Sequence, residues 1–280
     1  MRNCDDTYNL LELGAVHWLA RSLAFFDPGR YRLADKPLRD CARRAVGELS
    51  SLVALRLRID ERPLSPDYLA IVDHLAAVTS RPSFVDLVAH RRWSLWVCGM
   101  PYVALRLAGR EDPEQRWLLQ QAVTVGCPLT WESETWRHLE YAHFLRLAGI
   151  EHSLPTPSQV FPMTLLNHSP NGAISNEEDA YAIAHTVWYM TDYGLTQPLW
   201  PVGFAPGEAG DIVGALLRRY RLEGQSDLVA ELAAAAIALG DQASSELRAA
   251  WSYLRELQRP DGSLPSPPHL SPDETWDDVY

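Results

Sequence analysis

Three ionisable side chains, Glu178, His185 and Asp192, are spaced seven residues apart. Seven residues make almost two turns of α-helix, so the three side chains drift by only about 20° per step and share one face. Tyr181 and Tyr189 each lie four residues from His185, close enough to touch the imidazole on a helix. A histidine among aromatic rings, with carboxylates along the same face, is suited to general acid–base catalysis. We therefore predict that His185 transfers a proton and that Asp192 or Glu178 orients it.

Aromatic side chains are predicted to form the wall of a substrate pocket beside this histidine. The chain has ten tryptophans, and large rings offer apolar surface and π faces to a hydrophobic or cationic guest. An alternative interpretation is that His185 and Asp192 only make buried hydrogen bonds to neighbouring helices. The predicted substrate-binding residues are Tyr181, Trp188, Tyr189, Trp136 and Trp200.

A second cluster could bind a metal ion. Glu140 and His143 have the Glu-x-x-His spacing by which helical di-iron proteins present two ligands on one face. Glu134 and His138, four residues apart, form a second potential pair. Arg137 could instead pair with Glu134 or Glu140 at the surface. A divalent metal is therefore one candidate cofactor, and no motif indicates another. Further ligands would have to come from other helices, with Glu178, Asp179 and His185 as candidates.

The elements that carry these residues are predicted to be helices throughout. Apolar residues recur at helical spacing along almost the whole chain, and the two-residue alternation of strands is rare. Proline and glycine mark the boundaries, since proline is tolerated only in the first turn of a helix. The sequence predicts an all-α fold of about 10–12 helices in one domain over residues 1–280. The expected helices are 7–26, 37–58, 66–79, 83–90, 93–108, 113–124, 131–148, 177–193, 208–221, 225–239 and 242–258.

Two irregular stretches and a tail interrupt this pattern. Long loops are expected near 150–176 and 195–207, where prolines and aromatic residues accumulate. Loops of this length are often lids or substrate walls. Residues 273–280 form an acidic C-terminal tail.

The composition excludes several classes of protein. The chain has 36 acidic and 25 basic side chains, a formal net charge of −11, which argues against a general nucleic-acid binder. Its longest apolar runs fall well short of the 20 or so residues that a membrane span needs. The acidic N-terminus is unlike a secretory signal, so we expect a cytoplasmic protein.

The segment 250–264 resembles the repeat of α/α-toroid enzymes, the terpenoid cyclases and protein prenyltransferase β subunits. It carries an amphipathic helix that ends at Gln258, followed by a Pro-Asp-Gly turn. The resemblance covers a small part of the chain and implies an incomplete toroid with a central cavity. It also has departures, because Ser263 stands where the prenyltransferases have a zinc-binding cysteine. The tail has Asp-x-x-x-Asp-Asp where class II cyclases have Asp-x-Asp-Asp.

Two further segments, 11–18 and 178–194, look like an uncharacterised all-helical family of GC-rich bacteria that is often found near natural-product genes. This resemblance extends over most of the chain. It implies a place in bacterial specialised metabolism but supplies no chemistry. With the acid–base residues around His185, our leading interpretation is an enzyme of that metabolism, cyclase-like or transferase-like, that acts on a hydrophobic or peptide-like small substrate. The alternatives are a non-catalytic helical protein that binds a precursor peptide or partner enzyme, and a helical metalloenzyme.

Overall fold

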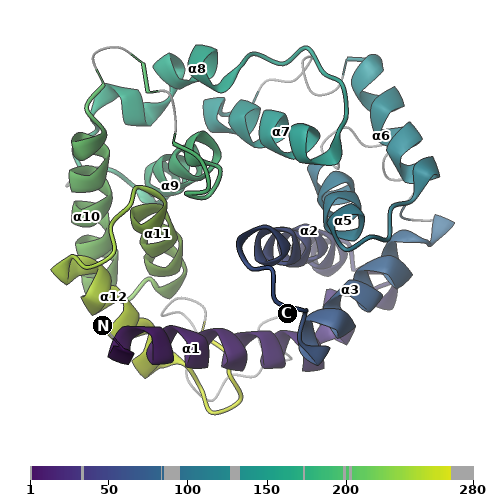
Figure 1. Ribbon diagram of the computed structural model, residues 1–280, viewed down its shortest axis with the longest axis horizontal. Coiled ribbons are helices and arrows are strands. Elements are labelled where there is room, and N and C mark those ends of the chain that lie inside the picture. The colour runs from purple at the N-terminus through teal and green to yellow at the C-terminus, as the bar shows by residue number, and fades with distance from the viewer. Residues whose placement is uncertain are drawn as a thin grey trace. The chain divides into compact units, whose positions relative to one another are not determined.

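The fold is all-α, as the sequence predicts. The computed structural model describes residues 2–32, 35–82, 84, 95–126, 133–172, 174–197, 200–201 and 204–265. Within these ranges the regular elements are eleven α-helices and four 3-10 helices, with no strand (Figure 1). None of the helices in these ranges is both long enough and apolar enough to cross a lipid bilayer.

The helix boundaries agree closely with the sequence pattern. The α-helices are α1 (Arg2–Arg21), α2 (Lys36–Ile59), α3 (Pro66–Thr79), α5 (Leu95–Leu107), α6 (Pro113–Thr124), α7 (Thr135–Ala148), α8 (Pro157–Val160), α9 (Glu177–Thr191), α10 (Pro206–Glu223), α11 (Ser226–Ala238) and α12 (Ser245–Leu257). The 3-10 helices are η1 (Leu23–Phe26), η2 (Pro28–Arg30), η4 (Phe161–Met163) and η5 (Leu165–His168).

The largest difference lies near the N-terminus, where the sequence predicts a helix over 7–26. The observed α1 begins earlier and ends at Arg21, and η1 and η2 follow it. The carboxylate of Asp27 accepts a hydrogen bond from the backbone N–H of Gly29 and caps η2, which favours a tight turn over a longer helix. The expected loop near 150–176 contains α8, η4 and η5. Except for residue 84, the expected helix 83–90 lies outside the described residues, as does the acidic tail.

The contacts group the chain into two compact units. The first unit comprises Met1–Leu11, Ser133–Glu140 and Pro155–Tyr280. The second comprises Glu12–Glu132 and Tyr141–Leu154. Helix α7 supplies residues to both, because its first turns belong to the first unit and its last turns to the second.

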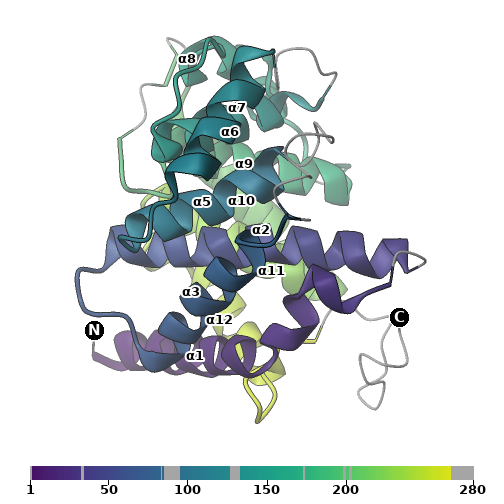
Figure 2. The ribbon, with the colours of Figure 1, turned by 90° about the vertical axis from the view of Figure 1, so that its right-hand side faces the viewer.

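In the second unit, α5 is the central helix. Ten of its 13 residues are buried, because it is apolar on every side. The long helix α2 runs beside it (Figure 2). Gly47 of α2 permits this close approach, since a Cβ atom there would lie 2.6 Å from Trp96 of α5. Gly99 of α5 likewise makes room for Phe144, whose Cε2 would be 2.5 Å from an added Cβ.

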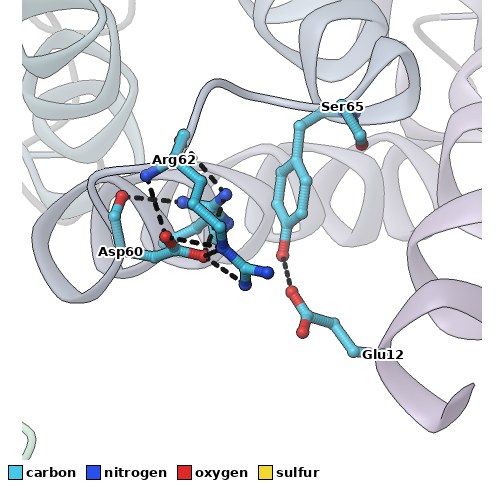
Figure 3. Close-up of polar contacts among 6 residues, drawn as sticks. Glu12, Asp60, Arg62 and Ser65 are labelled. Carbon is cyan, nitrogen blue, oxygen red and sulfur yellow. Dashed lines mark hydrogen bonds and ion pairs between the residues drawn. The ribbon is translucent and has the colours of Figure 1, made fainter. Parts of the chain in front are cut away.

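Charged side chains fasten the loop between α2 and α3 (Figure 3). The Arg62 guanidinium donates to both carboxylate oxygens of Asp60, to Oδ1 at 3.0 Å and to Oδ2 at 2.9 and 2.6 Å. Arg56 donates to the backbone oxygen of Asp60 at 2.8 Å. The hydroxyl of Tyr68 donates to Glu12 of α1 at 3.1 Å. The hydrogen bonds from Arg62 lower the pKa of Asp60 to about 2.

In the first unit, α9, α10 and α12 pack around α11. Small side chains allow close packing, and Ala180 and Ala184 of α9 are fully buried, as are Ala233 and Ala235 of α11. These residues belong to one apolar core that also includes α10 and α12.

The turn after α12 is held by the residues that suggest a toroid repeat. The side-chain amide of Gln258 donates to the backbone oxygens of Gly262 and Leu11, both at 3.0 Å. Asp261 accepts hydrogen bonds from the backbone N–H and the hydroxyl of Ser263. These side chains therefore stabilise the turn, which Gly262 completes with a φ of +93°.

Candidate active site

Helix α9 positions the candidate site and begins at a well-defined residue. The side chain of Asn176 accepts a hydrogen bond from the N–H of Asp179, and Asp179 accepts one from the N–H of Asn176. This reciprocal capping box satisfies two backbone donors at the start of the helix. The helix ends at Thr191, and its C-cap Asp192 takes a left-handed conformation with a φ of +52°.

Three polar pairs join α9 to α11 and its N-cap residue. Glu177 accepts from the amide of Gln225 at 3.1 Å, and the hydroxyl of Tyr181 donates to Asp227 at 2.5 Å. One turn further along both helices, Nε2 of His185 lies 3.7 Å from a carboxylate oxygen of Glu231. Residue numbers rise together on both helices, so α9 and α11 are parallel. The pairs are Glu177 with Gln225, Tyr181 with Asp227, and His185 with Glu231.

Aromatic rings surround His185, as the sequence predicts. The Trp136 ring of α7 stacks on the imidazole, with centroids 4.3 Å apart and planes 15° apart. Trp188 meets it edge-on at 4.8 Å. The rings of Tyr181 and Tyr189 lie 6.3 and 6.1 Å away and nearly parallel to it. The His185 side chain is nevertheless 16% exposed, so solvent still reaches part of it.

Trp200, the fifth predicted substrate-binding residue, lies in a different aromatic group. Its ring centroid is 5.3 Å from that of Phe161 and 5.1 Å from that of Phe204. All three side chains pack against the core of the first unit. The described ring contacts of Trp200 are therefore with this group and not with His185.

The carboxylate beside His185 comes from a residue that the sequence analysis did not single out. At 3.7 Å, the contact with Glu231 is too long for a hydrogen bond but close enough for strong electrostatic attraction once the imidazole is protonated. The signal was present, because Asp227 and Glu231 are the acidic residues, four apart, of an otherwise largely apolar helix. Of the two predicted partners, Glu178 is exposed in the first turn of α9, and Asp192 is buried at the helix end.

A buried carboxylate, that of Glu140, contacts two of the residues around His185. Glu140 is only 4% exposed. It accepts hydrogen bonds from the hydroxyl of Tyr189 and from the guanidinium of Arg137, both at 3.0 Å. The Arg137 guanidinium also lies over the Trp136 ring, 4.1 Å from its centroid. Arg137 and Glu140 together thus hold two of the rings that neighbour His185.

Burial and this carboxylate keep two phenols neutral. Burial is the largest cause that raises the pKa of Tyr189, and Glu140 raises it further. Burial also raises the pKa of Tyr193, whose ring meets that of Tyr189 edge-on at 6.0 Å. Both hydroxyls therefore keep their protons at neutral pH and can donate hydrogen bonds.

The predicted metal ligands do not gather further donors in the described part of the chain. Arg137 pairs with the exposed Glu134 at 3.4 Å, as the alternative interpretation expects, and also with Glu140, which is buried. His143 is buried in the part of α7 that belongs to the second unit. Across the described ranges, no three histidine, cysteine or acidic side chains are arranged to hold a metal ion.

A family described as Domain of unknown function (DUF6895) matches residues 12–278. The chain belongs to this family. Searches of curated proteins and of solved structures found no match. The DUF6895 match spans the whole candidate site, from Trp136 to Glu231, but its description names no activity. The chemistry open to this DUF6895 chain therefore follows from the side chains around His185.

The arrangement combines an acid–base group with neutral donors. An imidazole has an ordinary pKa near 6.5, so it can accept or release a proton at neutral pH. Glu231 stabilises the protonated form by its negative charge. Tyr189 and Tyr193 are protonated phenols on the same helix and its C-terminal turn. The imidazole can therefore move a proton, while the hydroxyl of Tyr189 donates to Glu140.

Proposed function

We propose that this member of the DUF6895 family is an enzyme in which His185 exchanges a proton with a bound substrate. The observation that supports this most directly is the partly exposed imidazole, stacked on Trp136, with Nε2 facing Glu231 at 3.7 Å. A carboxylate at this nitrogen stabilises the protonated imidazole, the form that a proton transfer to His185 produces. The aromatic surroundings limit its hydration and so strengthen its interaction with the carboxylate.

The proposed step is a proton transfer from the substrate to the imidazole of His185. The imidazolium that forms is stabilised by Glu231, which orients the ring and stays ionised. Glu231 therefore takes the function that the sequence analysis gave to Asp192 or Glu178. The Tyr189 hydroxyl donates its proton to Glu140, so this residue holds its ring beside the imidazole and leaves the proton transfer to His185.

The proposed substrate is a hydrophobic or peptide-like small molecule. Its apolar part would contact Trp136, Trp188 and Tyr181, whose rings flank the imidazole. The resemblance to a bacterial family near natural-product genes supports a place in specialised metabolism, in the cytoplasm. The repeat-like segment 250–264 supports a cyclase-like or transferase-like reaction within that class.

The test is a comparison of metabolites in the host organism. The gene is deleted and complemented with the wild type, with His185→Ala or with His168→Ala, and extracts are compared by mass spectrometry. We expect His185→Ala to match the deletion strain, with at least a hundredfold loss of the product. His168, an exposed histidine of η5 in the same unit, serves as the matched control and should restore the product.

The melting temperature of each purified variant completes this test. We expect His185→Ala to melt within a few degrees of the wild type, because the side chain is at the edge of the core. A stable His185→Ala protein that restores the full metabolite profile would contradict the enzymatic proposal.

A non-catalytic binding protein is the second candidate. It is favoured by Trp117 of α6, which is 59% exposed, and by Val125 at the end of this helix, which is 76% exposed. Exposed apolar side chains of this size are common at surfaces that bind another protein. On this alternative Trp117→Ser would abolish the metabolite product, whereas His185→Ala would leave it unchanged.

A further inference from the structure

The imidazole of His185 depends on its neighbours for its orientation. The torsion that turns a histidine ring has a broad energy minimum, so the side chain alone does not fix the ring plane. In this site three nearly parallel rings fix it. The Trp136, Tyr181 and Tyr189 planes are within 15°, 20° and 10° of the imidazole plane. With this plane, Nε2 faces Glu231 on α11.

Both tyrosines on either side of His185 are themselves anchored on carboxylates. Tyr181, four residues before the histidine, donates to Asp227 at 2.5 Å. Tyr189, four residues after it, donates to Glu140 at 3.0 Å. Hydrogen bonds to ionised acceptors are stronger than those between neutral groups. Each ring is therefore held at its far end by a different helix.

The Tyr181–Asp227 pair has the same spacing on both helices as the His185–Glu231 pair. Tyr181 precedes His185 by four residues on α9, and Asp227 precedes Glu231 by four residues on α11. Because the two helices are parallel, the Tyr181–Asp227 hydrogen bond links α9 to α11 one turn before the contact between His185 and Glu231. Buried apolar side chains set the coarse register of the helices. The hydrogen bond then fixes the ring that faces the imidazole.

We propose that Tyr181 and Asp227 are positioning residues, whose hydrogen bond holds the imidazole of His185 in the plane that directs Nε2 at Glu231. This assigns Tyr181 a function beyond that of a substrate wall. The importance of the orientation rests on the proposed function of His185, but the orientation itself can be measured without a substrate.

The experiment measures the pKa of His185 by NMR titration of the imidazole in the full chain. The described charged and titratable groups that contact the ring or its neighbours are Tyr181 and Tyr189 on α9, Tyr193 after this helix, Asp227 and Glu231 on α11, and Arg137 and Glu140 on α7. Glu231→Gln removes the stabilising charge, and we expect the proton affinity of His185 to fall about tenfold. Tyr181→Phe should lower the proton affinity of His185 about threefold or more, because the imidazole no longer faces Glu231.

The direction of the Tyr181→Phe shift separates positioning from a simple field effect. Without the Tyr181 hydroxyl, Asp227 loses a hydrogen-bond donor, and its unscreened negative charge would raise the pKa of His185. A lower pKa therefore requires weaker contact with Glu231. In the Glu231→Gln background, the Tyr181 substitution should no longer lower the pKa of His185, because this lowering acts through Glu231. An unchanged or higher pKa in Tyr181→Phe, or additive shifts, would overturn the proposal.

A second pair of variants covers the case in which Tyr181→Phe does not fold. Asp227→Asn and Asp227→Ala remove the same charge, but the asparagine oxygen still accepts a hydrogen bond from Tyr181. We expect Asp227→Ala to lower the proton affinity of His185 at least twofold more than Asp227→Asn does. Equal shifts would overturn the proposal. Tyr220→Phe is the matched control, because this buried hydroxyl has no hydrogen-bond partner among the described residues.

These measurements are independent of catalysis. If the pKa shifts follow the prediction and His185→Ala still restores the metabolite, the positioning holds and the enzymatic proposal fails. If His185→Ala abolishes the product and the shifts are absent, the enzymatic proposal holds and the positioning fails.

Discussion

At the scale of single residues, Glu140 holds two of the side chains around His185. It is buried, and its two oxygens accept from Tyr189 and from Arg137. Tyr189 is also buried, so its hydroxyl has little access to water as a replacement partner. The Arg137 side chain is 40% exposed and can be hydrated when its partner is removed. The loss of the Glu140 carboxylate should therefore reduce folding stability mainly because Tyr189 loses its hydrogen-bond acceptor.

We predict that Glu140→Ala lowers the free energy of unfolding by about 2 kcal/mol, because it leaves a buried hydroxyl without an acceptor. Glu140→Gln should cost about half as much, since the amide oxygen can still accept from Tyr189. Glu134→Ala, which removes the exposed partner of Arg137, should stay within about 0.5 kcal/mol of the wild type. Urea denaturation of the three variants provides the measurement. Equal losses for the glutamine and alanine variants at Glu140 would contradict this account.

At the scale of elements, the start of α9 determines where the site residues fall. Asn176 and Asp179 cap each other's backbone donors, and this fixes the first turn. Every site residue on α9 is then placed by counting turns from this cap. The same helix would present a different face to α11 if it began elsewhere.

Asn176→Ala should cost about 1 kcal/mol of folding stability, the usual cost of losing an N-cap. Asn176→Asp should retain most of this stability, because aspartate caps a helix equally well. Hydrogen exchange at the amides of residues 177–180 should rise in the alanine variant, while the amides of α11 stay protected. Unchanged exchange in this first turn would show that the cap does not hold the helix.

At the scale of the whole molecule, histidines and carboxylates with lowered pKa values make the free energy of unfolding fall as the pH falls below neutral. Burial lowers the pKa of His74 and of His152, so the unfolded chain takes up protons first as the pH falls below about 6.5. Arg81 lowers the pKa of Asp27, and Arg62 lowers that of Asp60 to about 2. These carboxylates stabilise the fold above their unfolded pKa, and this contribution is lost as the pH falls toward their folded pKa.

We therefore predict that the free energy of unfolding falls in two stages, from about pH 6.5 downward and again below about pH 4. Asp60→Asn should flatten the second stage between about pH 4 and 2, and a His74→Asn variant should flatten the first. Denaturation midpoints measured across a pH series provide the check. A midpoint that rises on acidification from pH 7 to 5 would refute the assignment of the histidines.

The sequence by itself determined what is local. Helical periodicity and the proline and glycine positions gave the all-α class and most helix ends. They also placed Tyr181, His185, Trp188 and Tyr189 together, because residues four apart on one helix are neighbours whatever surrounds them. The end of α1 was missed, since the capped turn at Asp27 competes with helix continuation over only a few residues.

Only the tertiary structure decided what faces this helix. Glu231 and Asp227 come from α11, and Trp136 and Glu140 come from α7, at least 36 residues away along the chain. A helical pattern specifies which side chains share a face, but not which other face packs against it. That choice follows from the shapes of the buried surfaces, where small residues such as Ala184 and Ala233 allow α9 and α11 to approach closely. The sequence alone therefore determined which residues of α9 lie together, whereas the packing of α11 against α9 determined which carboxylate lies at Nε2 of His185.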